Sequence, residues 1–151
     1  RSEFDAELTD AIAAVQPDWV ICAGYMRILG DAVVQRFRGR LLNIHPSLLP
    51  KHRGLHTHAR AIEAGDAEHG ASVHFVIPEL DAGAVIAQAP VPILAGDTPE
   101  SLAARVLGIE HPLLVSVLQM VAAGRIAERD GVATVDGQAL FTPLRLEFAP
   151  M

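Results

Sequence analysis

The feature of the sequence that most constrains its fold is an alternation between amphipathic helical segments and short runs dominated by apolar residues. Within residues 3–15, four apolar side chains recur at helical spacing, namely Phe4, Leu8, Ile12 and Val15. Residues 19–23 and 40–45 are short apolar runs instead, which are typical of strands buried on both faces of a parallel sheet. A short helix is expected between them, over 31–37. The alternation favours an α/β fold with a largely parallel central sheet.

The rest of the chain carries one strong helix signal and several weaker elements. Asp97-Thr98-Pro99 combines a cap residue with a proline in the first turn, and apolar residues then recur at helical spacing until Gly124. Asp130-Gly131 is typical of the turn of a small hairpin, here over 125–135. Prolines in the run 84–93 predict an edge strand or an irregular strand end. Also expected are a loop over 46–56, a weak helix over 57–64 and a strand over 71–77, with no clear pattern over the final residues.

Composition narrows the classes of function. The 151 residues are the size of one domain, and half of them are hydrophobic while a fifth are charged, which excludes a disordered chain. The formal net charge of −6 is unfavourable for general nucleic-acid binding. The single cysteine, Cys22, cannot form an intrachain disulfide, which favours a cytoplasmic protein. No apolar run is expected to reach the roughly 18 residues of a membrane span, so a membrane partner is not expected either.

Histidines are concentrated in one part of the chain. Six of the seven lie between positions 45 and 74, namely His45, His52, His56, His58, His69 and His74. Imidazole is a good zinc ligand, so a metal site is one interpretation. The sequence has no HExxH or CxxC motif, however, and no carboxylate at a familiar ligand spacing. We therefore predict no metal site.

Asn43 and His45 form a sharper candidate, at the carboxyl end of an expected buried strand. Ligands of open α/β sheets bind beyond the carboxyl ends of strands. Residues two apart on a strand point to the same side, so an amide and an imidazole would project together. The amide can stabilise an oxyanion, and the imidazole can move protons near neutral pH. The alternative, that both side chains cap loop backbone, is equally compatible with the spacing.

For several other residues, the sequence alone favours a structural role over a role in the site. Asp81 stands in a turn beside Gly83, where aspartate usually hydrogen-bonds local backbone. It would orient His45 only if that turn folds against the end of the strand. Cys22 lies in an apolar run and is expected in the core, as are the apolar side chains of 26–29.

Several runs of this sequence together resemble the phosphoribosylglycinamide formyltransferases, a family within the formyltransferase superfamily. The runs are residues 24–29, 43–50, 54–58, 65–76 and 79–83, and the resemblance extends from near Arg1 to about Gly137. The Asn-x-His strand end and the Leu-Asp-x-Gly turn are shared across the superfamily. The Gly-Leu-His run and the Glu-His-Gly-x-Ser-Val-His run are specific to the purine enzyme.

The resemblance implies a Rossmann-like formyltransferase fold and a definite reaction. A formyl group would pass from 10-formyltetrahydrofolate, the cosubstrate, to the amine of glycinamide ribonucleotide in purine biosynthesis, without a metal or a covalent enzyme intermediate. Asn43 and protonated His45 would stabilise the tetrahedral oxyanion. Asp81 would hold His45 together with an ordered water that relays protons.

The resemblance also implies the binding residues. The folate would contact Met26, Arg27, Ile28, Leu29, Val76 and Asp81. Glu110 and Arg1 would contact the ribonucleotide, and residues 51–58 would form a mobile flap over the site. Residues 1–151 would form a single formyltransferase domain that lacks roughly the first sixty residues of the family pattern, including a first strand and a glycine-rich phosphate loop.

Alternatives stay open at this point. A methionyl-tRNA formyltransferase would need an additional basic RNA-binding domain, and a 10-formyltetrahydrofolate hydrolase usually has histidine in place of Pro46. A non-catalytic folate-binding or metal-binding module is a further interpretation. The sequence leaves the oligomeric state undecided, a homodimer included.

Overall fold

The fold is built on a five-stranded sheet with the strand order β1-β2-β3-β4-β8. It was analysed in a computed structural model that describes residues 2–23 and 29–149. The strands are β1 (Val20–Cys22), β2 (Leu41–His45), β3 (Glu68–Phe75), β4 (Val85–Pro92) and β8 (Leu144–Arg145). The pairs β1–β2 and β4–β8 are parallel, and β3 is antiparallel to both of its neighbours. Four of the five strands therefore share one direction, which confirms the prediction of a largely parallel sheet.

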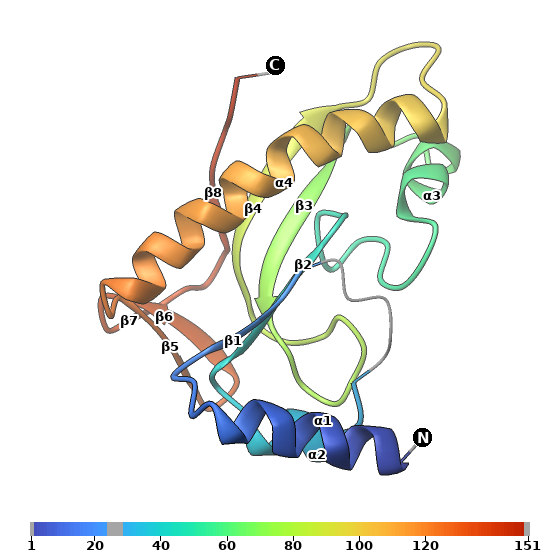
Figure 1. The fold of residues 1–151 in the computed structure, drawn as a ribbon. Coiled ribbons are helices and arrows are strands. Elements are labelled where there is room, and N and C mark those ends of the chain that lie inside the picture. The colour runs from blue at the N-terminus through green and yellow to red at the C-terminus, as the bar shows by residue number, and fades with distance from the viewer. Residues whose placement is uncertain (1, 24–28, 150–151) are drawn as a thin grey trace.

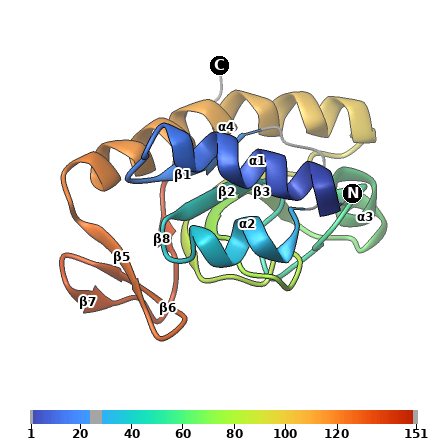
Figure 2. The same ribbon diagram turned by 60° about the horizontal axis from the view of Figure 1, so that its bottom comes forward.

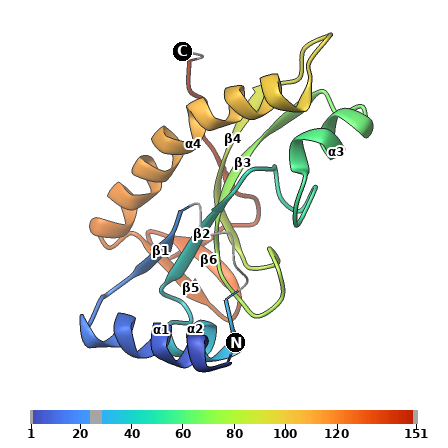
Figure 3. The same cartoon turned by 45° about the vertical axis from the view of Figure 1, so that its right-hand side comes forward.

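Helices cover this sheet on both sides (Figures 1 and 2). They are α1 (Ser2–Ala14), α2 (Asp31–Arg36), α3 (Thr57–Glu63) and α4 (Pro99–Ala122). The long helix α4 packs across β3 and β4, whereas α1 and α2 pack against each other. α3 lies beside the first half of α4 (Figure 3). All four helices were predicted, with boundaries that differ by one or two residues.

A small second sheet follows α4 (Figure 2). It consists of β5 (Ile126–Arg129), β6 (Val132–Val135) and β7 (Gln138–Ala139). Asp130 and Gly131 both have positive φ, of 51° and 79°, as the predicted tight hairpin turn between β5 and β6 requires. β7 and β8 were not predicted, because two residues are too few to show any periodicity.

The run 84–93 was predicted as an edge strand or as an irregular strand end, and β4 is the second of these, because it lies between β3 and β8 in the sheet. β8 pairs with β4 at Ala87 and Gln88 only. Pro90 and Pro92 lie beyond that ladder, at the end of β4 where its outer side carries no β8 partner. The prolines therefore mark an irregular strand end. The sequence did not predict the pairing with β8, because that pairing involves only two residues.

The sequence was expected to contain no apolar run long enough for a membrane span, but α4 is long and apolar enough for one by length and composition alone. It has 24 residues with a mean hydropathy of 1.4 over its most apolar window, and it is the only such helix among the described residues. Its apolar stripe is buried in the main core against the sheet, namely Leu102, Val106, Ile109, Leu113 and Val117. Packing on β3 and β4 accounts for this apolar face.

Candidate active site

A cavity of about 850 Å³ lies where β2 ends and the following loop begins. Its wall is made by the strands β1, β2 and β3, by one residue each of α2 and α4, and by loop residues together with the start of α3. These further residues are Leu29, Pro46, 54–58, 76–78 and 80–81. The side chains that line it are mostly apolar, with a few polar groups gathered at the end of β2. This composition is typical of a small-molecule site.

Most of the residues predicted for the site line this one cavity. Those that the structure describes are Asn43, His45, Asp81, Leu29, Val76 and Glu110. They come from β2, from the turn after β3, from the segment before α2 and from α4, so only the tertiary fold brings them together. The predicted positions Arg1, Met26, Arg27 and Ile28 lie outside the described residues.

Asn43 and His45 both face the cavity, as their spacing on the strand predicted. Asn43 is paired in register with Cys22 of β1 and His74 of β3. Among the described residues, no protein group hydrogen-bonds the side-chain amide of Asn43, which leaves that amide available to a ligand. The alternative that both side chains bond loop backbone therefore does not hold for Asn43, whereas it does hold for His45, which bonds the backbone carbonyl of His52 in the loop.

The imidazole of His45 is held between two oxygen atoms and is only 6% exposed. Its Nε2–H donates to the carbonyl oxygen of His52 at 2.9 Å, and its Nδ1 lies 3.4 Å from Oδ2 of Asp81. The ring thus has one oxygen atom within reach of each of its two nitrogen atoms, and an imidazolium at this position can donate to both oxygens at once.

Asp81 is fixed in place by an unusual turn. Its φ of 49° lies in the left-handed region, and its Oδ2 accepts a hydrogen bond from the Gly54 N–H at 2.8 Å. Gly83 lets the turn approach β3, because a Cβ at this position would overlap the carbonyl oxygen of Phe75. The turn thus folds against the sheet, and its aspartate does more than bond local backbone.

His74 is a residue of this site to which the sequence assigned no role. It is 2% exposed; its Nδ1–H donates to the carbonyl oxygen of Phe75 at 2.9 Å, and its Nε2 points at Oδ1 of Asp81 from 3.8 Å without a hydrogen-bond partner. Burial lowers the pKa of His74. Its membership of the Ser-Val-His run was the available signal, but the pairing of His74 with Asn43 needed the sheet register.

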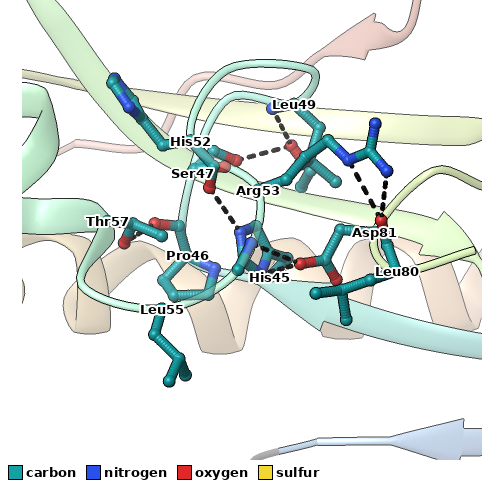
Figure 4. A network of polar contacts seen from close by, with 12 residues as sticks. His45, Pro46, Ser47, Leu49, His52, Arg53, Leu55, Thr57, Leu80 and Asp81 are labelled. Atoms are coloured by element: carbon teal, nitrogen blue, oxygen red, sulfur yellow. Dashed lines mark hydrogen bonds and ion pairs between the residues drawn. The ribbon is translucent and has the colours of Figure 1, made fainter. Parts of the chain in front are cut away.

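The loop over 46–56 is tied to the sheet at its start. The Ser72 hydroxyl donates to the carbonyl oxygen of Ser47 at 2.7 Å and accepts from the Leu49 N–H at 3.1 Å. Gln88 donates to the Leu49 carbonyl at 2.7 Å, and the Thr57 hydroxyl donates to the Pro46 carbonyl at 2.5 Å. The loop then continues along the cavity wall through 54–58 (Figure 4). That this segment moves as a flap stays a prediction.

The clustered histidines separate into hydrogen-bonded pairs. His52 Nε2 lies 2.7 Å from Oδ2 of Asp66, and His58 Nδ1 lies 3.1 Å from Nε2 of His69. Across the described ranges, 2–23 and 29–149, no three histidine, cysteine or acidic side chains are placed to hold a metal ion. These contacts give the histidines a structural role around the loop.

Two further wall residues have perturbed acidity. Burial raises the pKa of Glu110, which reaches the cavity from α4. Burial also raises the pKa of the Cys22 thiol. Cys22 packs against the smaller core cluster, as expected, but it lines the cavity as well and is only half-buried, so the prediction of a pure core residue was incomplete.

Known proteins are similar to this chain in both sequence and fold. The sequence model of the formyl transferase family matches residues 1–118. The phosphoribosylglycinamide formyltransferase of Escherichia coli is 52% identical over 140 residues, which are 93% of this chain and 66% of that protein. The protein of the same name from Haemophilus influenzae is 46% identical over 138 residues, 91% of this chain and 65% of that one. The chain thus spans about two thirds of the length of these curated relatives.

A solved structure gives the same result. The phosphoribosylglycinamide formyltransferase of Coxiella burnetii superposes with a TM-score of 0.90 at 44% sequence identity, covering 95% of this chain and 68% of that one. Because the family model matches residues 1–118 and the fold superposes on that of a solved formyltransferase, the chain belongs to the formyl transferase family.

Proposed function

We propose that the protein transfers a formyl group from 10-formyltetrahydrofolate to the amine of glycinamide ribonucleotide, a step of purine biosynthesis in the cytoplasm. The observation that carries this proposal is the imidazole of His45, held between Asp81 and the His52 carbonyl on a cavity wall that also includes Asn43, whose amide has no hydrogen-bond partner among the described residues. The names of the relatives from Escherichia coli and Haemophilus influenzae support the choice of substrates.

The reaction begins when the amine nitrogen attacks the formyl carbon. A carbon–nitrogen bond forms, and the formyl oxygen becomes an oxyanion in a tetrahedral intermediate. The bond between that carbon and the folate nitrogen then breaks, the carbonyl re-forms, and a proton from the amine ends on the folate nitrogen. The protein must stabilise the oxyanion and move this proton, so hydrogen-bond donors and a titratable group suffice without a metal.

Asn43 and His45 supply the stabilisation, as catalytic residues. The Asn43 amide donates to the oxyanion, and the His45 imidazolium places a positive charge beside it. Of the two His45 donors, Nε2–H is the one free to exchange partners, because a neutral backbone carbonyl holds it while a carboxylate faces Nδ1. Asp81 keeps the ring oriented, and it orders the water that relays the proton.

The cavity walls divide between the two substrates. Leu29 and Val76 offer apolar surface to the pterin of the folate, and Asp81 borders the same pocket. By the resemblance to the family, Met26, Arg27 and Ile28 are further folate contacts. Glu110 reaches in from α4 and accepts hydrogen bonds from the ribose hydroxyls of the ribonucleotide, with Arg1 as a further contact. The partners in this proposal are therefore small molecules.

The proposal is tested by Asn43→Ala, His45→Ala and Asp81→Asn in the protein expressed from its full gene. Loss of one oxyanion donor typically costs about 10²–10³ in rate, so we expect kcat to fall at least that far in each variant. Formyl-folate binding, measured by calorimetry, should stay close to that of the parent. The exposed His111→Ala on α4 is the control for loss of a histidine.

Two results would count against the proposal. Substantial formyl transfer by His45→Ala or Asp81→Asn would remove those residues from the catalytic set. Formate release at the parental rate without glycinamide ribonucleotide would identify a formyl-folate hydrolase instead of a transferase.

A further inference from the structure

One segment of three loop residues binds His45 through its first residue and Asp81 through its third. We call His52-Arg53-Gly54 the clip. The carbonyl oxygen of His52 accepts the hydrogen bond from His45 at 2.9 Å, and the N–H of Gly54 donates to the Asp81 carboxylate at 2.8 Å. The positions of the imidazole and of the carboxylate are therefore both set by the backbone of this clip.

The side chain of Arg53 fastens the clip to the turn that carries Asp81 (Figure 4). Its Nη2 and Nε donate to the carbonyl oxygen of Leu80 at 2.8 and 3.1 Å, and Leu80 immediately precedes Asp81. Its Nη2 also reaches Oε1 of Glu79 at 3.1 Å. From the other side, Nη1 of Arg60 on α3 donates to the Arg53 carbonyl at 2.5 Å. The guanidinium thus connects the clip with the turn after β3, although these two segments are far apart in the sequence.

The backbone on both sides of this connection is strained. His52, Gly54 and Asp81 have positive φ values of 56°, 84° and 49°. Non-glycine residues in this region persist only where surrounding contacts hold them. Without the Arg53 side chain, the contacts with Leu80 and Glu79 are both lost, and the Gly54–Asp81 hydrogen bond is the direct hydrogen bond that remains between clip and turn among the described residues. The strained segments would then be less restrained.

We propose that Arg53 is a positioning residue for formyl transfer, because it holds the clip and the turn at the separation that places the Asp81 carboxylate against the His45 imidazole. This inference rests on the proposed function. The paired donation to the Leu80 carbonyl carries the effect. The Glu79 carboxylate is 68% exposed, so its ion pair with Arg53 is screened by solvent and contributes little.

The test uses Arg53→Ala and Arg53→Lys, with Arg145→Ala as a matched control. Arg145 is likewise a partly exposed, ion-paired arginine, but it lies on β8 outside the cavity wall. A misplacement of about 1 Å can cost 10²-fold in rate, so we expect kcat of Arg53→Ala to fall about 10- to 100-fold with little change in either KM. A single ammonium cannot reproduce the two N–H donors, so Arg53→Lys should recover part of the loss. Glu79→Gln and Arg145→Ala should keep parental kcat.

The readouts separate positioning from a structural role. Active sites are counted by the stoichiometry of formyl-folate binding in calorimetry, and folding is checked by Tm. A parental kcat per site in Arg53→Ala would overturn the inference, and so would a loss of activity that merely follows a loss of folded sites. Equal losses in Glu79→Gln and Arg53→Ala would assign the effect to the ion pair and overturn it as well. If His45→Ala stays active, the proposed function fails first, and this inference fails with it.

Discussion

His69 shows how strongly burial acts on a single residue of this chain. It is 1% exposed, and its Nε2 lies 3.1 Å from Nδ1 of His58. Burial is the main cause that lowers the pKa of His69 to about 4; His58 and His52 act in the same direction, and the Asp66 carboxylate opposes them. His45 adds a smaller repulsion. His69 is therefore neutral in the folded protein at physiological pH, and an imidazolium there would be unfavourable.

This predicts acid sensitivity with a definite sign. Between the ordinary pKa of 6.5 and the folded value of about 4, the unfolded chain binds more protons at His69, so the free energy of unfolding falls as the pH is lowered through this window. Once the pH is below the folded value, the free energy of unfolding has lost on the order of 3 kcal/mol through His69. Urea unfolding of His69→Gln should show a flatter dependence on pH between about 6.5 and 4.

The exposed His111→Gln is the control for this experiment, and it should keep the parental pH dependence. An unchanged slope in His69→Gln would mean that other groups cause the acid sensitivity. His58 and His74 are the nearest such groups, because burial lowers the pKa of each.

Among the elements, the turn after β3 makes the strictest demand on one residue. Gly83 lets the turn lie against β3, because a Cβ on any other residue at this position would overlap the carbonyl oxygen of Phe75. Because neither side can rotate away, relief requires the whole turn to shift, and Asp81 would shift with it. This element therefore couples local packing to the geometry of the site.

Gly83→Ala should consequently lower both stability and activity. Overpacking against a rigid neighbour typically costs about 1–3 kcal/mol, and we expect a loss in the upper part of that range with a clear fall in kcat. Gly108→Ala is the matched control, because Gly108 is exposed on α4 and nothing lies within 4 Å of a Cβ there. Replacing glycine inside a helix should raise stability by about 0.5–1 kcal/mol. Thermal unfolding that showed equal effects for both variants would contradict this account.

At the scale of the whole molecule, α4 joins the sheet to the site. Its buried stripe covers β3 and β4, and the same helix places Glu110 in the cavity wall. Leu113 is fully buried in this interface, whereas Leu107 on the outer side is 67% exposed. The stability of the sheet and the shape of the cavity therefore depend on the same contact.

Leu113→Ala should destabilise the protein by about 2–5 kcal/mol, because the residues around a buried leucine cannot close the space that it leaves. Leu107→Ala should change the free energy of unfolding by less than about 0.5 kcal/mol. Denaturant titration of both variants checks the difference. A small effect of Leu113→Ala would show that α4 contributes less to the core than its burial indicates.

The elements that the sequence predicted well are those with a local signal. The capping box of Thr98 and Ser101 begins α4, and the turn at Asp130 and Gly131 closes the hairpin as expected. β8 has no such signal, since its pairing with β4 involves only two residues. The spacing of the apolar residues in α4 correctly predicted a helix. Why this helix is long and apolar is explained by the tertiary structure, because its apolar residues pack on β3 and β4.

For the candidate site, the sequence by itself determined that Asn43 and His45 share one side of a strand, because that relation depends only on the period of an extended chain. The resemblance to formyltransferases added Asp81, which the residues alone left as a turn aspartate. Only the tertiary structure decided that Asp81 meets His45, that His74 lies behind it and that Arg53 fastens the two loops. Those contacts depend on the register of β2 with β3 and on the close approach at Gly83, which no local pattern encodes.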